Sequence, residues 1–468
     1  MTTQTMRKYI LGTLLMAMSF ASSAQFNLGM HQFTGVPQSN YTNPGILPQS
    51  RFFIALPSVY VNYWNPTFVL DDVIKVVRDT VSNKDKSMLD FSKLYNERPG
   101  GTFGFNIEQQ SELFQIGFRI KKKNFISLGV YQGLQTGVRL PVDLLRLAQE
   151  GTTDYFQSNP IVLDDISLNI QSYVAYHVGF GREINDKWSV GGRVKLINGL
   201  VATSTEYARG KIYWDSDSVR LTSGLRYNTS GLARLDQSLG IFGGDSLRAL
   251  APGINVNDWV PMTGNMGLAF DLGFTYKPIK KLVLSFSATD LGSINWSEDL
   301  TSYVSDENEF TYRGGQITVG EDGGAGPFDG ITDSLLSGLN IQEEAGKTFT
   351  TRMNSRYILS ASYELLPNTF VGGIYSRNLS FNQTFDAFTA FAQFKIWNVL
   401  FLRGNYTLSQ GTFDNLGGAL AVNLGPLQIY TVADNLLALN NQGNVSSFNI
   451  RLGANLVFGM RKPKEKAD

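Results

Sequence analysis

The chain has 468 residues with 40 basic and 40 acidic side chains, so its formal net charge is zero and nothing in it favours a nucleic-acid partner. It contains no cysteine, which excludes disulfides, thiolate zinc sites, cysteine catalysis and a lipidated N-terminal cysteine. Charged residues make up only 17%, below the roughly 25% of ordinary soluble domains, while glycine and aromatic residues are abundant. This composition favours a strand-rich protein with lipid-facing aromatic side chains.

The first 24 residues predict export. Arg7 and Lys8 form a short basic start, residues 10–20 form an apolar run, and small residues lead up to Ala24. Because the run is too short to cross a bilayer as a helix, we predict a signal peptide cleaved after Ala24; a membrane anchor or a buried helix is the alternative. No later apolar run is long enough for a transmembrane helix, so any spanning structure must be a closed barrel.

Residues 25–99 are expected to form an N-terminal periplasmic or lumenal segment. Within it, residues 51–64 resemble a strand, and two placements stay open. They join the wall together with another segment, or they lie in the lumen as part of a plug. Residues 68–95 predict a short helical element in the lumen or periplasm, because apolar residues recur there at helical spacing, at Val69, Val73, Ile74 and Val77.

Residues 100–459 predict a transmembrane antiparallel β-barrel, because apolar side chains alternate with small or polar ones in one segment after another. In the last segment, the even positions from 448 to 458 are apolar or Ala, whereas positions 449, 451, 453 and 455 carry Asn, Arg, Gly and Asn. Such segments number about fourteen, within a supported range of roughly 12 to 16 strands. They are residues 102–108, 114–121, 125–133, 166–182, 188–198, 266–276, 282–289, 357–365, 370–377, 388–396, 400–408, 416–424, 427–434 and 448–458.

The connections between these segments are of two kinds, as in outer-membrane barrels, where short turns face the periplasm and long loops face outward. Counting backwards from the last strand makes Thr102 the start of the first regular wall strand. A short helix is expected in one loop, at residues 141–149, and a basic periplasmic tail at 460–468. Aromatic residues beside the short turns predict an interfacial girdle: Trp188, Tyr276, Trp397 and Phe458.

Several short motifs carry a family resemblance: Asn43-Pro44-Gly45, residues 53–57, residues 191–200, residues 431–435 and the ending 450–459. With them the chain resembles a family of outer-membrane β-barrels of unknown function from Bacteroidota. More remotely it is similar to the FadL-like long-chain fatty-acid transporters, which have fourteen strands, an early Asn-Pro-small motif and an N-terminal plug. It departs from them in lacking a clearly apolar, glycine-rich N-terminal hatch. The remote resemblance implies transport of hydrophobic compounds by analogy of fold alone.

Charged side chains on the strands are expected to face the lumen, because an Arg or Lys facing lipid near the midplane costs roughly 2 to 4 kcal/mol. Two interpretations stay open: a mildly basic path for anionic solutes, and a salt-bridged filling that stiffens the wall. Alternation assigns the inward face to Arg119, Lys121, Arg193, Lys195, Asp271, Glu364, Arg377, Arg403 and Arg451.

Catalysis is not expected. The chain has two histidines, His31 and His177. His177 lies within a predicted strand, where a serine partner would have to come from a neighbouring one, and no nucleophile–base pair can be identified. The serines that alternation allows as neighbours are Ser189, Ser285 and Ser360.

No cofactor or metal site is expected either. Residues 321–330 carry carboxylates among glycines, but their spacing does not match an EF-hand, so a surface loop is preferred to a calcium site. Asp434-Asn435 is expected to make a turn. The Gly191-Gly192 pair predicts a bend or a close backbone approach.

The leading hypothesis is an outer-membrane β-barrel, not an enzyme, that acts as a channel or transporter for small or hydrophobic solutes. The alternative is a non-transporting accessory or assembly component of an outer-membrane secretion or gliding machine. The expected surroundings are outer-membrane lipid and, in the alternative, other outer-membrane or periplasmic proteins. The two hypotheses differ in whether the lumen opens.

Overall fold

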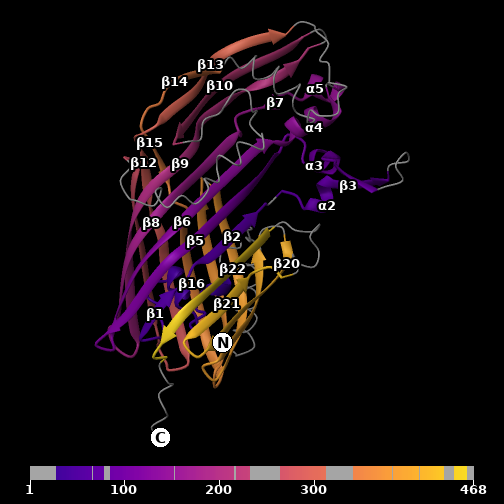
Figure 1. Ribbon diagram of the computed structural model, residues 1–468. Coiled ribbons are helices and arrows are strands. Elements are labelled where there is room, and N and C mark those ends of the chain that lie inside the picture. Colours follow the sequence, from indigo (N-terminus) through magenta and orange to yellow (C-terminus); the bar gives the residue numbers. More distant parts are fainter. Residues whose placement is uncertain are drawn as a thin grey trace, which may run out of the picture.

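Fourteen antiparallel strands close into a β-barrel (Figure 1). The computed structural model describes residues 28–460 apart from positions 66, 79–84, 152, 216–217, 232–263, 313–340, 382, 410–411 and 437–446. The predicted signal peptide, the loop at 321–330 and all but the first residue of the predicted tail lie outside the described residues. Within the described part of the chain, no helix has the length and apolar character needed to cross a membrane.

Each wall strand pairs with a strand on either side, and the first pairs with the last. The first wall strand consists of β1 (Phe52–Ala55) and β2 (Ser58–Trp64), and both halves pair with β5 on one side and β22 on the other. Pro57 lies in the break between the halves, because proline has no N–H for a ladder. The other wall strands follow in barrel order: β5 (Thr102–Ile120), β6 (Asn124–Pro141), β8 (Ser167–Glu183), β9 (Trp188–Trp214), β11 (Met266–Tyr276), β12 (Leu282–Trp296), β16 (Ser355–Leu366), β17 (Thr369–Ser380), β18 (Gln383–Ile396), β19 (Leu400–Ser409), β20 (Thr412–Leu424), β21 (Leu427–Ala433) and β22 (Ser447–Phe458).

The predicted strand count is confirmed, but two of the segments behind it change. Residues 102–108 and 114–121 belong to one strand, β5, whose register shifts at a bulge between Glu112 and Phe114. The side chains at even positions face inward before this bulge and those at odd positions after it, so the alternation looks like two separate crossings. The inference that Thr102 begins the wall is therefore wrong. Residues 51–64 supply the missing strand.

The two faces of the wall have opposite chemistry, as the alternation predicts. On β11, the side chains of Met266, Leu268, Phe270, Leu272 and Phe274 are exposed on the outside, while the positions between them face inward. Exposed apolar rows of this kind recur around the wall, as a lipid-facing surface requires.

The short turns gather at the end of the barrel where β22 finishes (Figure 1). We call it the turn end and the opposite end the loop end; the turn-length rule predicts a periplasmic position for the turn end. The four aromatic residues of the predicted girdle lie at this end. Trp188 stacks on Tyr276 with ring centroids 4.2 Å apart, Phe458 stacks on Phe52, and Trp397 is 82% exposed in a turn.

The wall continues far beyond a membrane at the loop end. β9 has 27 residues, whereas a tilted membrane-spanning strand needs about 9–11. Its outer half pairs with β10 (Val219–Ser230), which pairs with β13 (Leu300–Tyr312), at the top of Figure 1. Shorter strands complete this extension: β7 (Ile161–Val162), β14 (Gln342–Ala345) and β15 (Phe349–Arg352).

The expected helical element at 68–95 is largely wrong in both structure and place. This stretch contains α2 (Leu70–Val73), a hairpin of β3 (Ile74–Arg78) and β4 (Asp85–Leu89), and the start of α3 (Ser92–Glu97). Ile74 and Val77 have the apolar spacing of a helix, but they lie in β3, which pairs with β4. Because the stretch joins the top of β2 to the top of β5, it lies at the loop end and not in the lumen or periplasm (Figure 1).

The helix expected at 141–149 is confirmed as α4 (Val142–Glu150), with Pro141 as its N-cap. α4 packs near α3 and α5 (Asp154–Ser158) at the loop end. The guanidinium of Arg146 lies 4.6 Å from the ring centroid of Tyr95. Burial and the hydrogen bond to Glu150 raise the pKa of Tyr95 to about 12, so its phenol remains a donor.

The N-terminal segment lies inside the barrel. Residues 28–50, which we call the plug, contain two 3-10 turns, η2 (Leu28–Met30) and η3 (Pro37–Tyr41), and nearly all of their side chains are buried. The plug belongs to no strand of the wall. The sequence leaves two placements open for residues 51–64, a wall strand or part of a plug. These residues form the first wall strand, and the stretch before them, residues 28–50, forms the plug.

Candidate functional site: the plug and the charged chamber

Asp434 holds the first residues of the plug. Its carboxylate accepts the backbone N–H of Leu28 at 3.0 Å and of Gly29 at 2.7 Å, and also the side-chain amide of Asn449 at 3.0 Å. Asp434 is fully buried just beyond the end of β21. The expected turn role for this residue therefore misses its main contacts, which join residues more than four hundred positions apart.

Some carbonyl groups of the plug accept N–H groups within its own turns, and six others accept hydrogen bonds from wall side chains and not from a strand ladder. Because an unpaired buried carbonyl is costly, each such contact matters to the docked position. The donors come from strands on several sides of the barrel. They are Arg403 to His31 O, Gln428 Nε2 to Gly35 O (2.8 Å), Arg193 Nη2 to Asn40 O (3.1 Å), Ser287 Oγ to Thr42 O (2.7 Å), Ser189 Oγ to Gly45 O (2.7 Å) and Arg119 Nη2 to Pro48 O (2.5 Å).

The Asn43-Pro44-Gly45 motif packs directly on the wall backbone. A Cβ on Gly191 would lie 2.1 Å from the carbonyl oxygen of Pro44, and a Cβ on Gly273 would lie 2.0 Å from Oδ1 of Asn43. The expectation of a close backbone approach at Gly191 is confirmed. Glycine on β9 and β11 thus creates the seat in which this motif rests.

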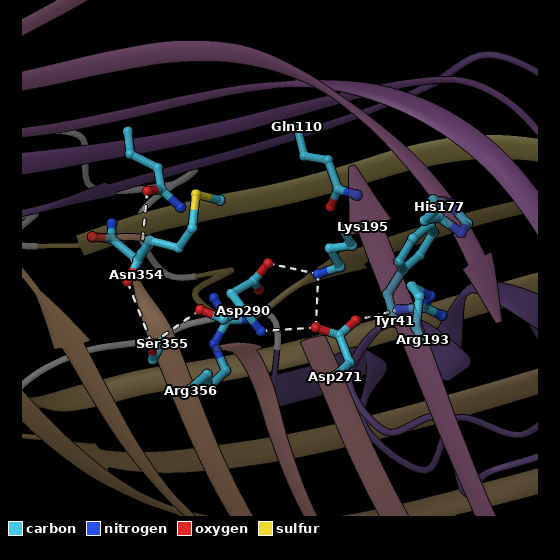
Figure 2. Close-up of polar contacts among 12 residues, drawn as sticks. Tyr41, Gln110, His177, Arg193, Lys195, Asp271, Asp290, Asn354, Ser355 and Arg356 are labelled. Atoms are coloured by element: carbon cyan, nitrogen blue, oxygen red, sulfur yellow. Dashed lines mark hydrogen bonds and ion pairs between the residues drawn. The ribbon is translucent and has the colours of Figure 1, made fainter. Parts of the chain in front are cut away.

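A network of buried charges lies beside the plug (Figure 2). Asp271 of β11 pairs with both Arg193 and Lys195 of β9, each at 2.8 Å, and Lys195 also pairs with Asp290 at 2.6 Å. Arg193 and Asp271 have no exposed side-chain surface. Asp290 sits at a break in β12 with φ +58°, and its N–H donates to Asp271. Arg193 also donates to the side chain of Asn40, so the network binds wall and plug together.

The network borders a small cavity, which we call the chamber. Its volume is about 30 Å³, room for roughly two water molecules. Arg356 on its wall pairs with Glu108 at 3.2 Å, and Arg451 donates to Gln110 at 2.6 Å. The lining is polar throughout and consists of Tyr41, Thr42, Tyr60, Glu108, Gln109, Gln110, Tyr131, Tyr173, Lys195, Asp290, Arg356 and Arg451.

The lumenal residues expected from the sequence fall into three groups. Arg193, Lys195, Asp271, Arg403 and Arg451 are buried inside the barrel. Of the residues placed near the turn end, Arg119 contacts the plug and pairs with Glu183 at 2.9 Å, Glu364 is half-buried, and Lys121 is exposed in a turn. Arg377 is on the other face of the wall.

The inward assignment of Arg377 is wrong. On β17 the buried positions are Ile374, Ser376, Asn378 and Ser380, so Arg377 points outward and is half-exposed. It lies near the loop end of the strand and binds Asp386 of β18 through two bonds of 2.7 and 2.8 Å. A paired charge close to the membrane edge avoids the midplane penalty on which the assignment rested.

Three charged residues of the chamber are absent from that expected set: Glu108, Asp290 and Arg356. Glu108 and Asp290 stand at the edges of predicted strands, and Arg356 precedes one by a single position. Glu108 and Arg356 continue the inward alternation of their strands, whereas Asp290 follows the inward Thr289 directly, at a register shift between β11 and β12. Following the alternation of each predicted strand to its ends and one position beyond them identifies Glu108 and Arg356 as inward-facing.

The histidines occupy packed positions. His31 of the plug contacts Ser360 Oγ at 3.0 Å and Ser285 Oγ at 3.3 Å through Nε2, so these serines adjoin His31 and not His177. His177 contacts the hydroxyl of Tyr41, which donates to Glu112 at 2.9 Å. Both histidines are buried, and neither lines the chamber. Among the described residues, no group of His, Asp and Glu could hold a metal ion.

The family model that matches this chain describes a family of unknown function, DUF5723, and covers residues 44–434. No curated protein matches the sequence. The family match carries no taxon, so an origin in Bacteroidota stays a prediction.

Solved structures similar to the chain include transport proteins of the FadL type. The Ralstonia pickettii toluene transporter TbuX is 10% identical, with 94% of this chain and 95% of that chain covered and a TM-score of 0.42. A Pseudomonas aeruginosa FadL homologue is 10% identical, with 92% and 96% covered and a TM-score of 0.43. The Pseudomonas putida toluene transporter TodX is 10% identical, with 93% of each chain covered and a TM-score of 0.37. At these scores, no function follows from the likeness.

Proposed function

The chain belongs to DUF5723, a family of unknown function, and from the geometry of its wall and plug we propose that it is an outer-membrane channel for small solutes closed by its own N-terminal segment. Passage would require the plug, residues 28–50, to leave its seat wholly or in part. No catalytic step is proposed. The cargo is a solute small enough to pass a fourteen-stranded lumen once the plug has moved.

The observation that carries this proposal is the independence of wall and plug. The wall closes through pairing of β1 and β2 with both β5 and β22, without any hydrogen-bonded strand from residues 28–50. Side chains of an eight-stranded wall fill its interior, whereas barrels of about 16 strands leave an aqueous channel. A fourteen-stranded wall approaches the second case, so its lumen would hold water if the plug were absent.

The attachment of the plug suits a part that moves. Its C-terminal end continues into β1 at the turn end, where Arg51 N–H bonds to Phe458 O at 3.0 Å. Its other end is held by Asp434. Between the two lie side-chain contacts, each worth about 0.5–1.5 kcal/mol net for a neutral donor and about 1.5–3 kcal/mol for an arginine. Releasing the Asp434 end would allow the segment to swing towards the turn end while it remains tethered.

The test is conductance of the purified protein in planar bilayers, with and without residues 28–50. The intact barrel is expected to be closed for most of the time, and the deletion variant to show stable openings. Heat-modifiable gel mobility checks that the deletion variant still folds. A folded deletion variant with no conductance and no uptake of small sugars or amino acids into liposomes would overturn the proposal.

A cysteine pair tests movement without deletion. A Cβ on Gly35 would lie 2.6 Å from Cγ of Phe401, so the two Cβ atoms come within the roughly 4 Å that a disulfide spans. Because the chain has no cysteine, Gly35→Cys with Phe401→Cys gives one defined bridge. Oxidised protein should not open, and reduction should restore opening; the reduced form is the matched control for the lost packing. Equal opening in both forms would exclude plug movement.

A second candidate function is an accessory role in a larger outer-membrane assembly. It is favoured by the extension of β9, β10 and β13 beyond the membrane, which a simple pore does not require. Failure of the deletion variant to conduct, together with native protein that is extracted in a complex of fixed stoichiometry, would favour this role over transport.

A further inference from the structure

We propose that the barrel binds the headgroups of anionic phospholipids along one half of the rim at its turn end. This half consists of three neighbouring turns with the strand ends beside them, residues 121–123, 182–187 and 277–281, which we call the basic rim. The proposal concerns the lipid around the closed barrel, so it goes beyond the proposed channel function and does not depend on movement of the plug.

The basic rim concentrates positive charge. It carries eight cations, all of them exposed, and only two carboxylates, Glu183 and Asp186. Glu183 pairs at 2.9 Å with Arg119, whose side chain is buried and also contacts the plug. An anionic surface would balance the excess charge of the rim. The exposed cations are Lys121, Lys122, Lys123, Arg182, Lys187, Lys277, Lys280 and Lys281.

Backbone hydrogen bonds hold the three turns side by side. The N–H of Glu183 donates to Lys123 O at 2.8 Å, and the N–H of Lys277 donates to Lys187 O at 2.7 Å. Lys187 and Lys277 are therefore neighbours on adjacent strands, where like charges destabilise a sheet. The wall gains nothing from this placement, whereas a bound anionic headgroup would offset the repulsion.

The first turn carries lysines where their backbone conformation is unfavourable. Lys121 and Lys122 have φ angles of +48° and +61°, in the left-handed region that Gly and Asn adopt more readily than other residues. Hairpin turns with positive φ at two positions strongly prefer Asn-Gly or a similar pair. Lysine at both positions therefore indicates a use for the charge and not for the turn geometry.

The other half of the rim provides a comparison within the same protein. Its turns, residues 366–368, 396–399 and 424–426, contain no charged residue. Lys395, just before one of these turns, is half-buried and donates inward to Gln49 of the plug at 3.3 Å. Both halves expose apolar side chains that can contact lipid, but only the basic rim adds a row of cations.

Apolar side chains within and beside the basic rim favour lipid over an acidic protein as the partner. Ile184 and Ile279 are each at least half exposed in their turns, and Ile120 is exposed at the end of β5. Trp188 stacks on Tyr276 between two of the turns, as interfacial aromatic residues do. Isoleucines that enter the acyl layer beside lysines that reach the phosphates match the boundary of a bilayer. A partner bound by charge alone would not need them.

The test is native mass spectrometry of the full mature chain, released from detergent micelles that contain equal amounts of phosphatidylglycerol and phosphatidylcholine with the same acyl chains. More phosphatidylglycerol than phosphatidylcholine should stay bound, and added salt should reduce this preference through screening. Each lysine near an anionic surface contributes roughly fivefold to binding. Neutralising three of them, with Lys187→Gln, Lys277→Gln and Lys280→Gln together, should therefore remove most of the preference.

The matched control removes the same number of charges from exposed positions of the loop end, with Arg209→Gln, Lys211→Gln and Lys347→Gln together. These residues lie on the extension beyond the membrane or beside it, so the preference for phosphatidylglycerol should persist. Heat-modifiable gel mobility checks that both triple variants fold.

Equal retention of the two lipids by the unaltered protein would overturn the proposal, also if the rim captures an acidic protein instead, and this measurement needs no variant. An unchanged preference in the rim variant, or an equal loss in both triple variants, would overturn it as well. A barrel that prefers phosphatidylglycerol but never conducts would keep this inference and lose the channel proposal, so the two failures can be told apart.

Discussion

Replacing Asp271 with Asn is expected to lower the free energy of unfolding by about 3 kcal/mol, because it removes the counter-charge shared by two buried cations. Asp271 is fully buried and lies 2.8 Å from both Arg193 and Lys195. Asparagine keeps the size of the side chain, so the change in packing is small. The loss therefore reports mainly on charge.

The expected loss of unfolding free energy depends on the contacts that Arg193 and Lys195 retain in the variant. Breaking a buried ion pair by removing one partner typically costs about 3–5 kcal/mol. Arg193 would retain its bonds to the backbone and side chain of Asn40, and Lys195 would retain Asp290 at 2.6 Å. These remaining contacts place the expected cost at the lower end of that range.

The assay is urea unfolding of the barrel in lipid vesicles, followed by tryptophan fluorescence. Asp386→Asn is the matched control, because it breaks the ion pair with Arg377, whose side chain is half-exposed; exposed pairs contribute about 0–1 kcal/mol. A cost below about 1 kcal/mol for Asp271→Asn, or an equal cost for both variants, would refute the view that the lumenal charges are a paired, buried network.

Gly191→Ala is expected to displace the plug and expose it to protease, because the new methyl group would lie 2.1 Å from the backbone oxygen of Pro44; Gly192→Ala, whose nearest contact would be at 3.6 Å, should leave protease resistance unchanged. Leu272→Arg should cost roughly 2–4 kcal/mol in the vesicle assay if this exposed side chain faces lipid near the midplane, and Phe458→Arg at the turn end only about 0–1. Asp434→Asn should speed hydrogen exchange at the first plug residues, since its amide nitrogen cannot accept an N–H; unchanged exchange there would remove Asp434 as the attachment point.

The general form of the wall could be predicted because lipid imposes alternation on every crossing, and the short turns divide the crossings clearly. The errors arose where alternation is interrupted. The bulge after Glu112 changes which positions of β5 face inward, and Pro57 divides the first strand into halves of 4 and 7 residues. Alternation therefore divides β5 into two apparent crossings and misses the first strand, so the predicted total is still fourteen.

The face of a charged residue is harder to predict near a strand end. On β17, polar and apolar residues occur at both parities, so alternation alone does not determine the direction of Arg377. The membrane penalty also falls towards the edge of the bilayer, where a pair such as Arg377 with Asp386 is tolerated outside. The penalty is a reliable guide only for positions within the apolar band, such as Arg193 and Asp271.

Alternation does not distinguish an open lumen from a filled one, because both require polar inward side chains. An open lumen and a filled one differ in the hydrogen-bonding partners that their inward polar side chains must satisfy. Water can satisfy any group lining an open pore, whereas a plug without ladder partners needs a donor for each buried carbonyl, at a cost of about 1–3 kcal/mol for each one left unpaired. Neutral donors such as Ser189, Ser287 and Gln428 meet that need here. Since water can replace every one of these bonds, a plug held in this way can leave the lumen without leaving unsatisfied groups behind, provided that water enters as it leaves.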